Sequence, residues 1–172
     1  GESHLALVSD GQLVYARSIR AGLNSVMTSV GQACGTDPDE SYRLVTELGF
    51  DRHTGPELAL TKGLERGLKP VVSGVFMTLK AVEGGSVPAR IYLTGALSRV
   101  PGLSDYLAGA LGTDVVVLDL RQSLEELNPQ SVPVGPEFAP VASVLLGLVR
   151  RGSSMPLNFR RGDLAYQGDL RL

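Results

Sequence analysis

The segment through Thr94, Gly95 and Ala96 is the part of the chain whose residue types are best suited to ligand chemistry. Residues 91–94 have the composition of a strand, Gly95 supplies a turn, and Pro101 begins a helix. A glycine lets the backbone approach a ligand closely, and the free N–H groups at a helix N-terminus favour anions. The same pattern also makes an ordinary connection between a strand and a helix, so this segment alone leaves both interpretations open.

Catalysis and metal binding find little support elsewhere in the sequence. The two histidines, His4 and His53, and the single cysteine, Cys34, do not have the spacing of zinc ligands. A serine nucleophile needs a base and an orienting acid, whereas Ser9 precedes an Asp-Gly pair that is typical of a hairpin turn. A Gly-x-x-x-x-Gly-Lys-Ser/Thr phosphate loop is missing from the sequence. We therefore expect no metal, no bound cofactor and no enzymatic activity.

The composition indicates a folded soluble domain. Of the 172 residues 43% are hydrophobic, and 16 Lys and Arg against 18 Asp and Glu leave a formal charge of -2. This balance gives no strong field that would favour nucleic acid or an anionic membrane. Cys34 has no partner for an internal disulfide, which indicates a reducing compartment and a small buried thiol.

The first half of the chain predicts a hairpin and two short helices. The expected elements are strands over residues 4–9 and 12–18, a helix of about 12 residues after Gly22 that Gly35 ends, and a helix over 39–48. Asp37 and Pro38 have the residue types of an N-cap and of the first helical position. Residues 36–55 form a small helical insertion in this prediction.

A longer helix is expected over residues 57–82, where leucines and valines recur at intervals of three or four. One face of this helix should be buried. Pro70 removes a backbone donor and predicts a kink or a short break. Gly63, Gly67 and Gly74 should weaken the helix further, so that it depends on packing.

The second half predicts a strand, a helix and a second strand, which together imply a parallel pair. The expected ranges are a strand over 89–94, a helix over 101–111 closed by Gly112, a strand over 115–119 and a final helix over about 137–151. The final helix should cover one face of a sheet.

Three segments resemble, in order, the actin, Hsp70 and sugar-kinase superfamily. Residues 1–22 are similar to the second phosphate-loop region of FtsA and PilM, and residues 91–103 look like the adenosine motif. Asn128-Pro129 and the small residues that follow (Ala139, Ala142 and Gly147) resemble the end of the same lobe. The resemblance implies that residues 1–152 form an α/β, ribonuclease-H-like second lobe. In such a lobe the β-rich portions share one mixed sheet with helices on both faces.

The C-terminal segment is similar to one particular branch of that superfamily. Residues 156–166 resemble the Asn-Leu/Phe-x-x-Gly-x-x-Ala segment that follows the actin-like domain of GspL, the inner-membrane L component of type II secretion. The related PilM of type IV pili is the second candidate. The resemblance implies that residues 153–172 are an extension leading towards a membrane segment in the full protein.

The implied function is that of a scaffold at the cytoplasmic face of the bacterial inner membrane. It would link a secretion or pilus motor ATPase to inner-membrane platform proteins by protein–protein binding. A lobe without its neighbour exposes an apolar face, which favours a homodimer.

Two departures from the superfamily pattern argue against nucleotide binding. Ala96 replaces the second residue of a Gly-Gly pair, and Gly1-Glu2-Ser3-His4 replaces a Thr-rich turn and adds a negative charge. The resemblance thus implies only a remnant nucleotide pocket at Thr94, Gly95 and Ala96. The alternatives are an ATP-binding enzyme or switch in which these three residues line the nucleotide, and an FtsA-like filament protein.

Overall fold

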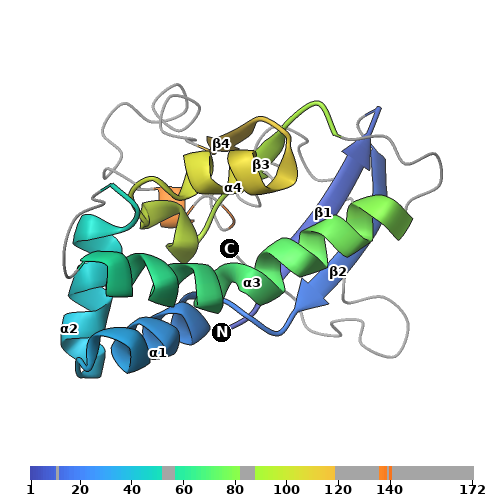
Figure 1. The fold of residues 1–172 in the computed structure, drawn as a ribbon. Helices are drawn as coiled ribbons and strands as arrows, with labels where there is room; N and C mark the ends of the chain where they lie inside the picture. Colours follow the sequence, from blue (N-terminus) through green and yellow to red (C-terminus); the bar gives the residue numbers. More distant parts are fainter. Residues whose placement is uncertain (11, 52–56, 82–87, 119–135, 139, 141–172) are drawn as a thin grey trace, which may run out of the picture.

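The computed structural model describes residues 1–10, 12–51, 57–81, 88–118, 136–138 and 140. Strands β1 (Ser3–Ser9) and β2 (Gln12–Ile19) precede helices α1 (Leu23–Cys34), α2 (Pro38–Arg43) and α3 (Glu57–Ala81), with a π-helical turn η1 (Leu44–Leu48) after α2. Then come β3 (Ile91–Leu93), the 3-10 turn η2 (Ala96–Arg99), α4 (Leu103–Leu111), β4 (Val115–Val117) and the 3-10 turn η3 (Pro136–Phe138). Helix α3 crosses the middle of the molecule, between α1 on one side and β3, β4 and α4 on the other (Figure 1).

The predicted hairpin is confirmed. β1 and β2 pair in antiparallel fashion from Ser3–Ile19 to Ser9–Gln12, with a shift in register between Leu7 and Val8. Asp10 has a φ of +50°, as a tight turn of this kind requires. Gly11, the other expected turn residue, lies outside the described residues.

The described strands form two sheets and not the single mixed sheet that the resemblance implies. β1 pairs with β2, and β3 pairs with β4 in parallel register from Ile91–Val115 to Leu93–Val117. The parallel pair itself is as predicted, although β3 is shorter than the expected 89–94. Side chains from β1 and β3 line a cavity between the two sheets, and ladder hydrogen bonds do not join these strands.

Helix α3 can pack in the core because of Gly63, Gly67 and Gly74, although glycines are expected to weaken a helix. A Cβ atom on Gly67 would lie 2.6 Å from Cα of Val26, and one on Gly63 would lie 2.8 Å from Cα of Val30. These glycines let the backbones of α1 and α3 meet directly. Gly74 receives the side chain of Ile19 in the same way. Tight packing also explains why α3 continues without a break through Pro70.

The core is centred on the contact of α1 and α3 and extends to α4. Its buried members are Val26, Val30, Val45, Phe50, Leu60, Leu64, Leu68, Val100, Leu103, Leu107 and Val115. The expected burial of one face of the long helix is therefore confirmed. The helix predicted over 101–111 is also confirmed as α4, which spans Leu103–Leu111. Gly112, in the left-handed conformation (φ +67°), closes it as predicted.

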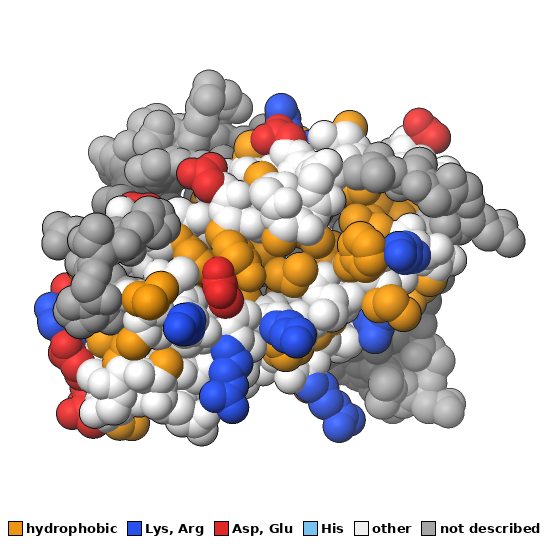
Figure 2. All heavy atoms as spheres, viewed as in Figure 1, with side chains coloured by type: hydrophobic (Ala, Val, Ile, Leu, Met, Phe, Trp, Pro, Cys, Tyr) orange, Lys and Arg blue, Asp and Glu red, His pale blue; other side chains and the backbone are white. Residues whose placement is uncertain are grey.

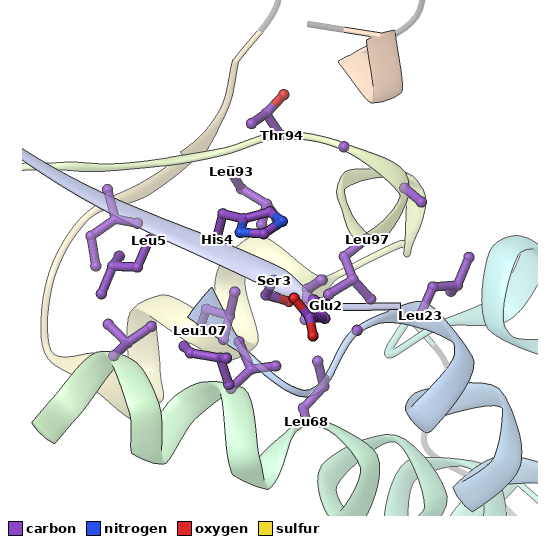
Figure 3. Close-up of a pocket in the computed structure, with 18 of the residues that line it drawn as sticks. Glu2, Ser3, His4, Leu5, Leu23, Leu68, Leu93, Thr94, Leu97 and Leu107 are labelled. Carbon is purple, nitrogen blue, oxygen red and sulfur yellow. The ribbon is translucent and has the colours of Figure 1, made fainter. Parts of the chain in front are cut away.

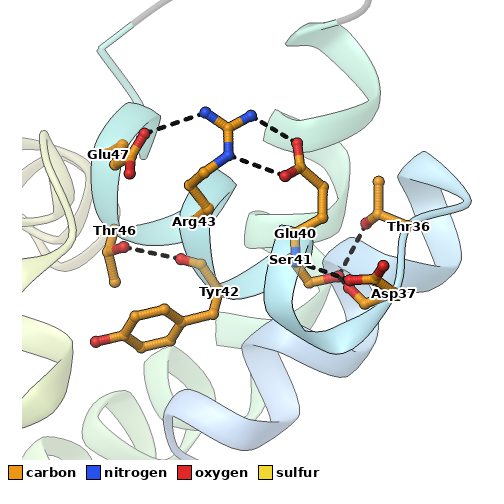
Figure 4. Close-up of polar contacts among 8 residues, drawn as sticks. All are labelled: Thr36, Asp37, Glu40, Ser41, Tyr42, Arg43, Thr46 and Glu47. Carbon is orange, nitrogen blue, oxygen red and sulfur yellow. Dashed lines mark hydrogen bonds and ion pairs between the residues drawn. The ribbon is translucent and has the colours of Figure 1, made fainter.

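The helical insertion begins as predicted and then differs in detail. Asp37 is the N-cap of α2, and its Oδ1 atom accepts a hydrogen bond of 2.8 Å from the backbone N–H of Glu40 (Figure 4). The buried hydroxyl of Ser41 donates to the carbonyl of Asp37 over 2.7 Å. The expected single helix over 39–48 is α2 followed by the π-helical turn. Of the expected final helix, the structure describes only η3 and Pro140; its remaining residues, and the extension over 153–172, lie outside the described part.

The N-cap gives a first testable prediction. Asp37→Ala is expected to lower the free energy of unfolding by about 1 kcal/mol, because it removes the acceptor for the N–H of Glu40. Asp39→Ala is the matched control, since Asp39 lies in the first turn but is not the cap. Urea unfolding of the three proteins measures the difference. Equal losses in both variants would show that the cap bond does not stabilise α2.

Candidate functional site

A cavity of about 390 Å³ lies between the two sheets, with α3 as its floor. Residues of β1, the end of β2, α3, α4 and the turn after β3 line this cavity, so segments far apart in the sequence meet there (Figure 3). Its apolar lining consists of Leu5, Ile19, Leu23, Leu68, Val71, Val75, Ile91, Leu93, Ala96, Leu97, Leu103, Leu107, Leu111 and Pro140. Its volume is within the range of small-molecule sites.

The three site residues predicted from the sequence, Thr94, Gly95 and Ala96, all line this cavity. Residues 2–4, the remnant of the second phosphate loop in the resemblance, line it as well. The side chains of Leu93 and Thr94 point to opposite sides of the chain, as alternation at a strand end requires (Figure 3).

Gly95 holds the turn between β3 and η2. Its φ of +82° and ψ of -167° form a conformation that side chains strongly disfavour. A Cβ atom there would meet nothing within 4 Å, so the backbone geometry and not a neighbouring atom requires glycine. Its carbonyl accepts hydrogen bonds from the N–H of Ser98 at 3.0 Å and from the Ser98 hydroxyl at 2.6 Å. These bonds fix the turn that carries Ala96 at the edge of the cavity.

The deep walls of the cavity come from residues that sequence reasoning did not assign to a site. Leu68 and Leu103 are each 1% exposed, and Leu107 is 6% exposed. The helical spacing of the apolar residues in α3 predicted that one face of that helix, which includes Leu68, would be buried. The spacing carries no signal that part of the buried face would line a cavity.

The polar side chains of the described lining are few, and those of Ser3 and His4 form hydrogen bonds that hold the first strand. The Ser3 hydroxyl donates to the carbonyl of Ala21 over 2.7 Å, and Nδ1 of His4 lies 3.0 Å from the Ser18 hydroxyl. Glu2 is the only carboxylate of the described lining, which contains no Lys or Arg. A nucleoside triphosphate would therefore meet one negative charge and no fixed cation, which is unfavourable for its phosphates.

The described part of the chain shows neither a metal-binding cluster nor an activated thiol. No group of three His, Cys, Asp or Glu side chains there is arranged to hold a metal ion. Burial raises the pKa of the Cys34 thiol, which keeps it protonated and poorly nucleophilic. None of the helices described by the structure has the length and apolar character needed to cross a bilayer.

Comparison with known proteins leaves the arrangement of the cavity as the main guide to function. The chain matches no protein-family model, and it has no significant match among curated proteins.

Proposed function

We propose that this chain is a protein-binding scaffold lobe of the GspL or PilM type. In this proposal it acts at the cytoplasmic face of the bacterial inner membrane and links a motor ATPase to platform proteins of a type II secretion or type IV pilus system. The proposal takes its partners from the resemblance of residues 1–22, 91–103 and 156–166. It takes its binding mode from the cavity.

The observation that carries the proposal is the apolar character of the cavity at the place where the resemblance puts a nucleotide. Leucines form its walls, and Lys and Arg are absent from its described lining. Such a cavity can accept a leucine or phenylalanine side chain of a partner. Complete burial of a side chain of this size contributes about 1.5–3 kcal/mol. A single anchored side chain of this kind is typical of the residues that dominate protein interfaces.

A tryptophan at the cavity edge tests this binding mode. Ala96 is exposed and lines the cavity, whereas Ala110 is exposed on α4 and does not line it. We expect Ala96→Trp to weaken binding of the motor ATPase by about tenfold, because the indole competes with the partner's side chain. Ala110→Trp should bind as the unchanged protein does. Surface plasmon resonance with the motor ATPase immobilised measures both, and equal affinities for the two variants would contradict the proposal.

The second candidate function is ATP binding, as in the nucleotide-binding members of the superfamily that the chain resembles. One observation favours it: residues 2–4 and Thr94–Ala96, which match the phosphate and adenosine loops in the resemblance, line one cavity. This alternative predicts saturable binding of ATP with Mg²⁺. It also requires that cations outside the described lining compensate the charge of Glu2 and of the phosphates.

A further inference from the structure

The exposed face of α3 carries a row of cations with two apolar side chains among them. The basic stripe, as we define it, consists of Lys62, Arg66, Lys69, Phe76, Met77 and Lys80, all of which are exposed. At 100° per residue these positions fall within an arc of about 100° around the helix axis. The residues of α3 that line the cavity, such as Val71, lie on the opposite side of the helix. The stripe is thus a separate surface.

The stripe is strongly positive although the whole chain is slightly negative. Lys and Arg side chains gather over α3 on the face shown in Figure 2. Among the described residues the ion pairs involve Arg43, Arg90 and Arg99, and no carboxylate pairs with a cation of the stripe. Burial raises the pKa of the Tyr106 hydroxyl on α4, and the nearby carboxylate of Glu65 raises it further, so Glu65 lies on the side of α3 that approaches α4. Within the described part, no carboxylate thus forms an ion pair with these cations, although the exposed Glu65 adjoins the stripe between Lys62 and Lys69.

The two apolar side chains in the stripe project between the charges. Phe76 is 45% exposed and Met77 is 61% exposed. Nζ of Lys80 lies 4.4 Å from the centre of the Phe76 ring, so the ring and the ammonium group are adjacent. Aromatic rings beside lysines suit the boundary between lipid headgroups and acyl chains, where one part is apolar and the other is hydrated.

We propose that the basic stripe docks α3 on an anionic lipid bilayer. The stripe from Lys62 to Lys80 extends over about 27 Å of an unbroken helix, a length that spans several lipid headgroups. An acidic protein is the competing partner, but three of the four cations are lysines, which are depleted in protein interfaces. Mobile anionic lipids can gather around widely spaced ammonium groups without a matching rigid surface. This inference uses none of the cavity residues, so it holds or fails independently of the proposed scaffold function.

Binding to vesicles tests the proposal with two variants of equal net charge. Lys62→Gln/Arg66→Gln/Lys69→Gln removes three charges from the stripe, and Arg43→Gln/Arg90→Gln/Arg99→Gln removes three charges elsewhere. Flotation with phosphatidylcholine vesicles that contain phosphatidylglycerol measures the partition coefficient, and circular dichroism verifies that each variant is folded. We expect the stripe variant to bind about 100-fold more weakly than the unchanged chain, because each cation near an anionic surface contributes about fivefold. The control variant should bind within a few fold of the unchanged chain.

The contribution of the apolar side chains is tested separately. Phe76→Ser/Met77→Ser should weaken the binding that remains at high salt, because insertion of apolar groups is not screened. Equal weakening by the stripe variant and its control would overturn the proposal, since it would reveal an effect of net charge alone. Equal binding to vesicles of phosphatidylcholine alone would also overturn it. So would failure to bind anionic vesicles while polyglutamate binds the stripe, because that result would indicate an acidic protein partner.

Discussion

Replacing Gly49 with alanine is expected to lower the free energy of unfolding by about 4 kcal/mol, the sum of backbone strain and a steric clash. Gly49 has a φ of +52° and a ψ of -129°, which a residue with a side chain adopts only with strain of about 1–3 kcal/mol. A Cβ atom there would lie 2.3 Å from the carbonyl oxygen of Pro101. The same oxygen accepts a 2.9 Å hydrogen bond from the N–H of Phe50, so it cannot move away without loss of that bond.

Gly112→Ala is the matched control for this prediction. Gly112 also has a positive φ (+67°), but a Cβ atom there would meet nothing within 4 Å. We expect Gly112→Ala to lower the free energy of unfolding by only about 1 kcal/mol, which is the strain of a left-handed residue with a side chain. Urea unfolding of both variants separates backbone strain from steric clash. Similar losses would indicate that the turn after η1 does not pack against Pro101 as the structure shows.

The double variant Gly63→Ala/Gly67→Ala is expected to lose about 3 kcal/mol of the free energy of unfolding. Each new Cβ atom would overlap a backbone atom of α1, at 2.8 Å from Cα of Val30 and 2.6 Å from Cα of Val26. Backbone atoms cannot rotate away, so the two helices must move apart and the core between them must loosen. The better helix propensity of alanine, about 1 kcal/mol per site, offsets only part of this loss.

Gly109→Ala is the control for helix propensity. Gly109 is an exposed residue of α4, and a Cβ atom there would meet nothing within 4 Å. The substitution should raise the free energy of unfolding by about 1 kcal/mol. Calorimetry or urea unfolding measures both changes. If the double variant were also more stable, α1 and α3 would not be in backbone contact.

Local signals in the sequence were sufficient to predict most of the individual elements. The Asp-Gly turn, the N-cap at Asp37 and the stop at Gly35 act over a few residues, and the structure confirms all three elements that they define. The burial of one face of α3 also followed from spacing alone. Such features depend on chain geometry within one element and need no knowledge of the tertiary arrangement.

Features that depend on contacts between distant elements were not predicted. The glycines of α3 looked like helix weaknesses because the sequence does not reveal that α1 approaches Gly63 and Gly67 and that Ile19 approaches Gly74. The resemblance implied a single mixed sheet, whereas the strands that the structure describes form two sheets. Element order does not specify whether β1 and β3 share hydrogen bonds, because side chains between them can hold the strands apart.

The candidate site was predicted in part. Thr94, Gly95 and Ala96 were found because a strand, a glycine turn and a helix leave a recognisable pattern at that point. The leucines that give the cavity its apolar character come from α3 and α4. In the sequence they are indistinguishable from ordinary core residues. The structure therefore changed the expected chemistry of the pocket more than its position.

The most direct test of the apolar cavity is a fluorescence titration of the whole chain with N-phenyl-1-naphthylamine, an uncharged apolar probe, followed by addition of ATP and Mg²⁺. We expect saturable binding of the probe at one site, weaker binding by Ala96→Trp than by Ala110→Trp, and no displacement by ATP. Displacement of the probe by ATP, or saturable binding of ATP that Ala96→Trp abolishes, would contradict the scaffold interpretation and identify the cavity as a nucleotide site.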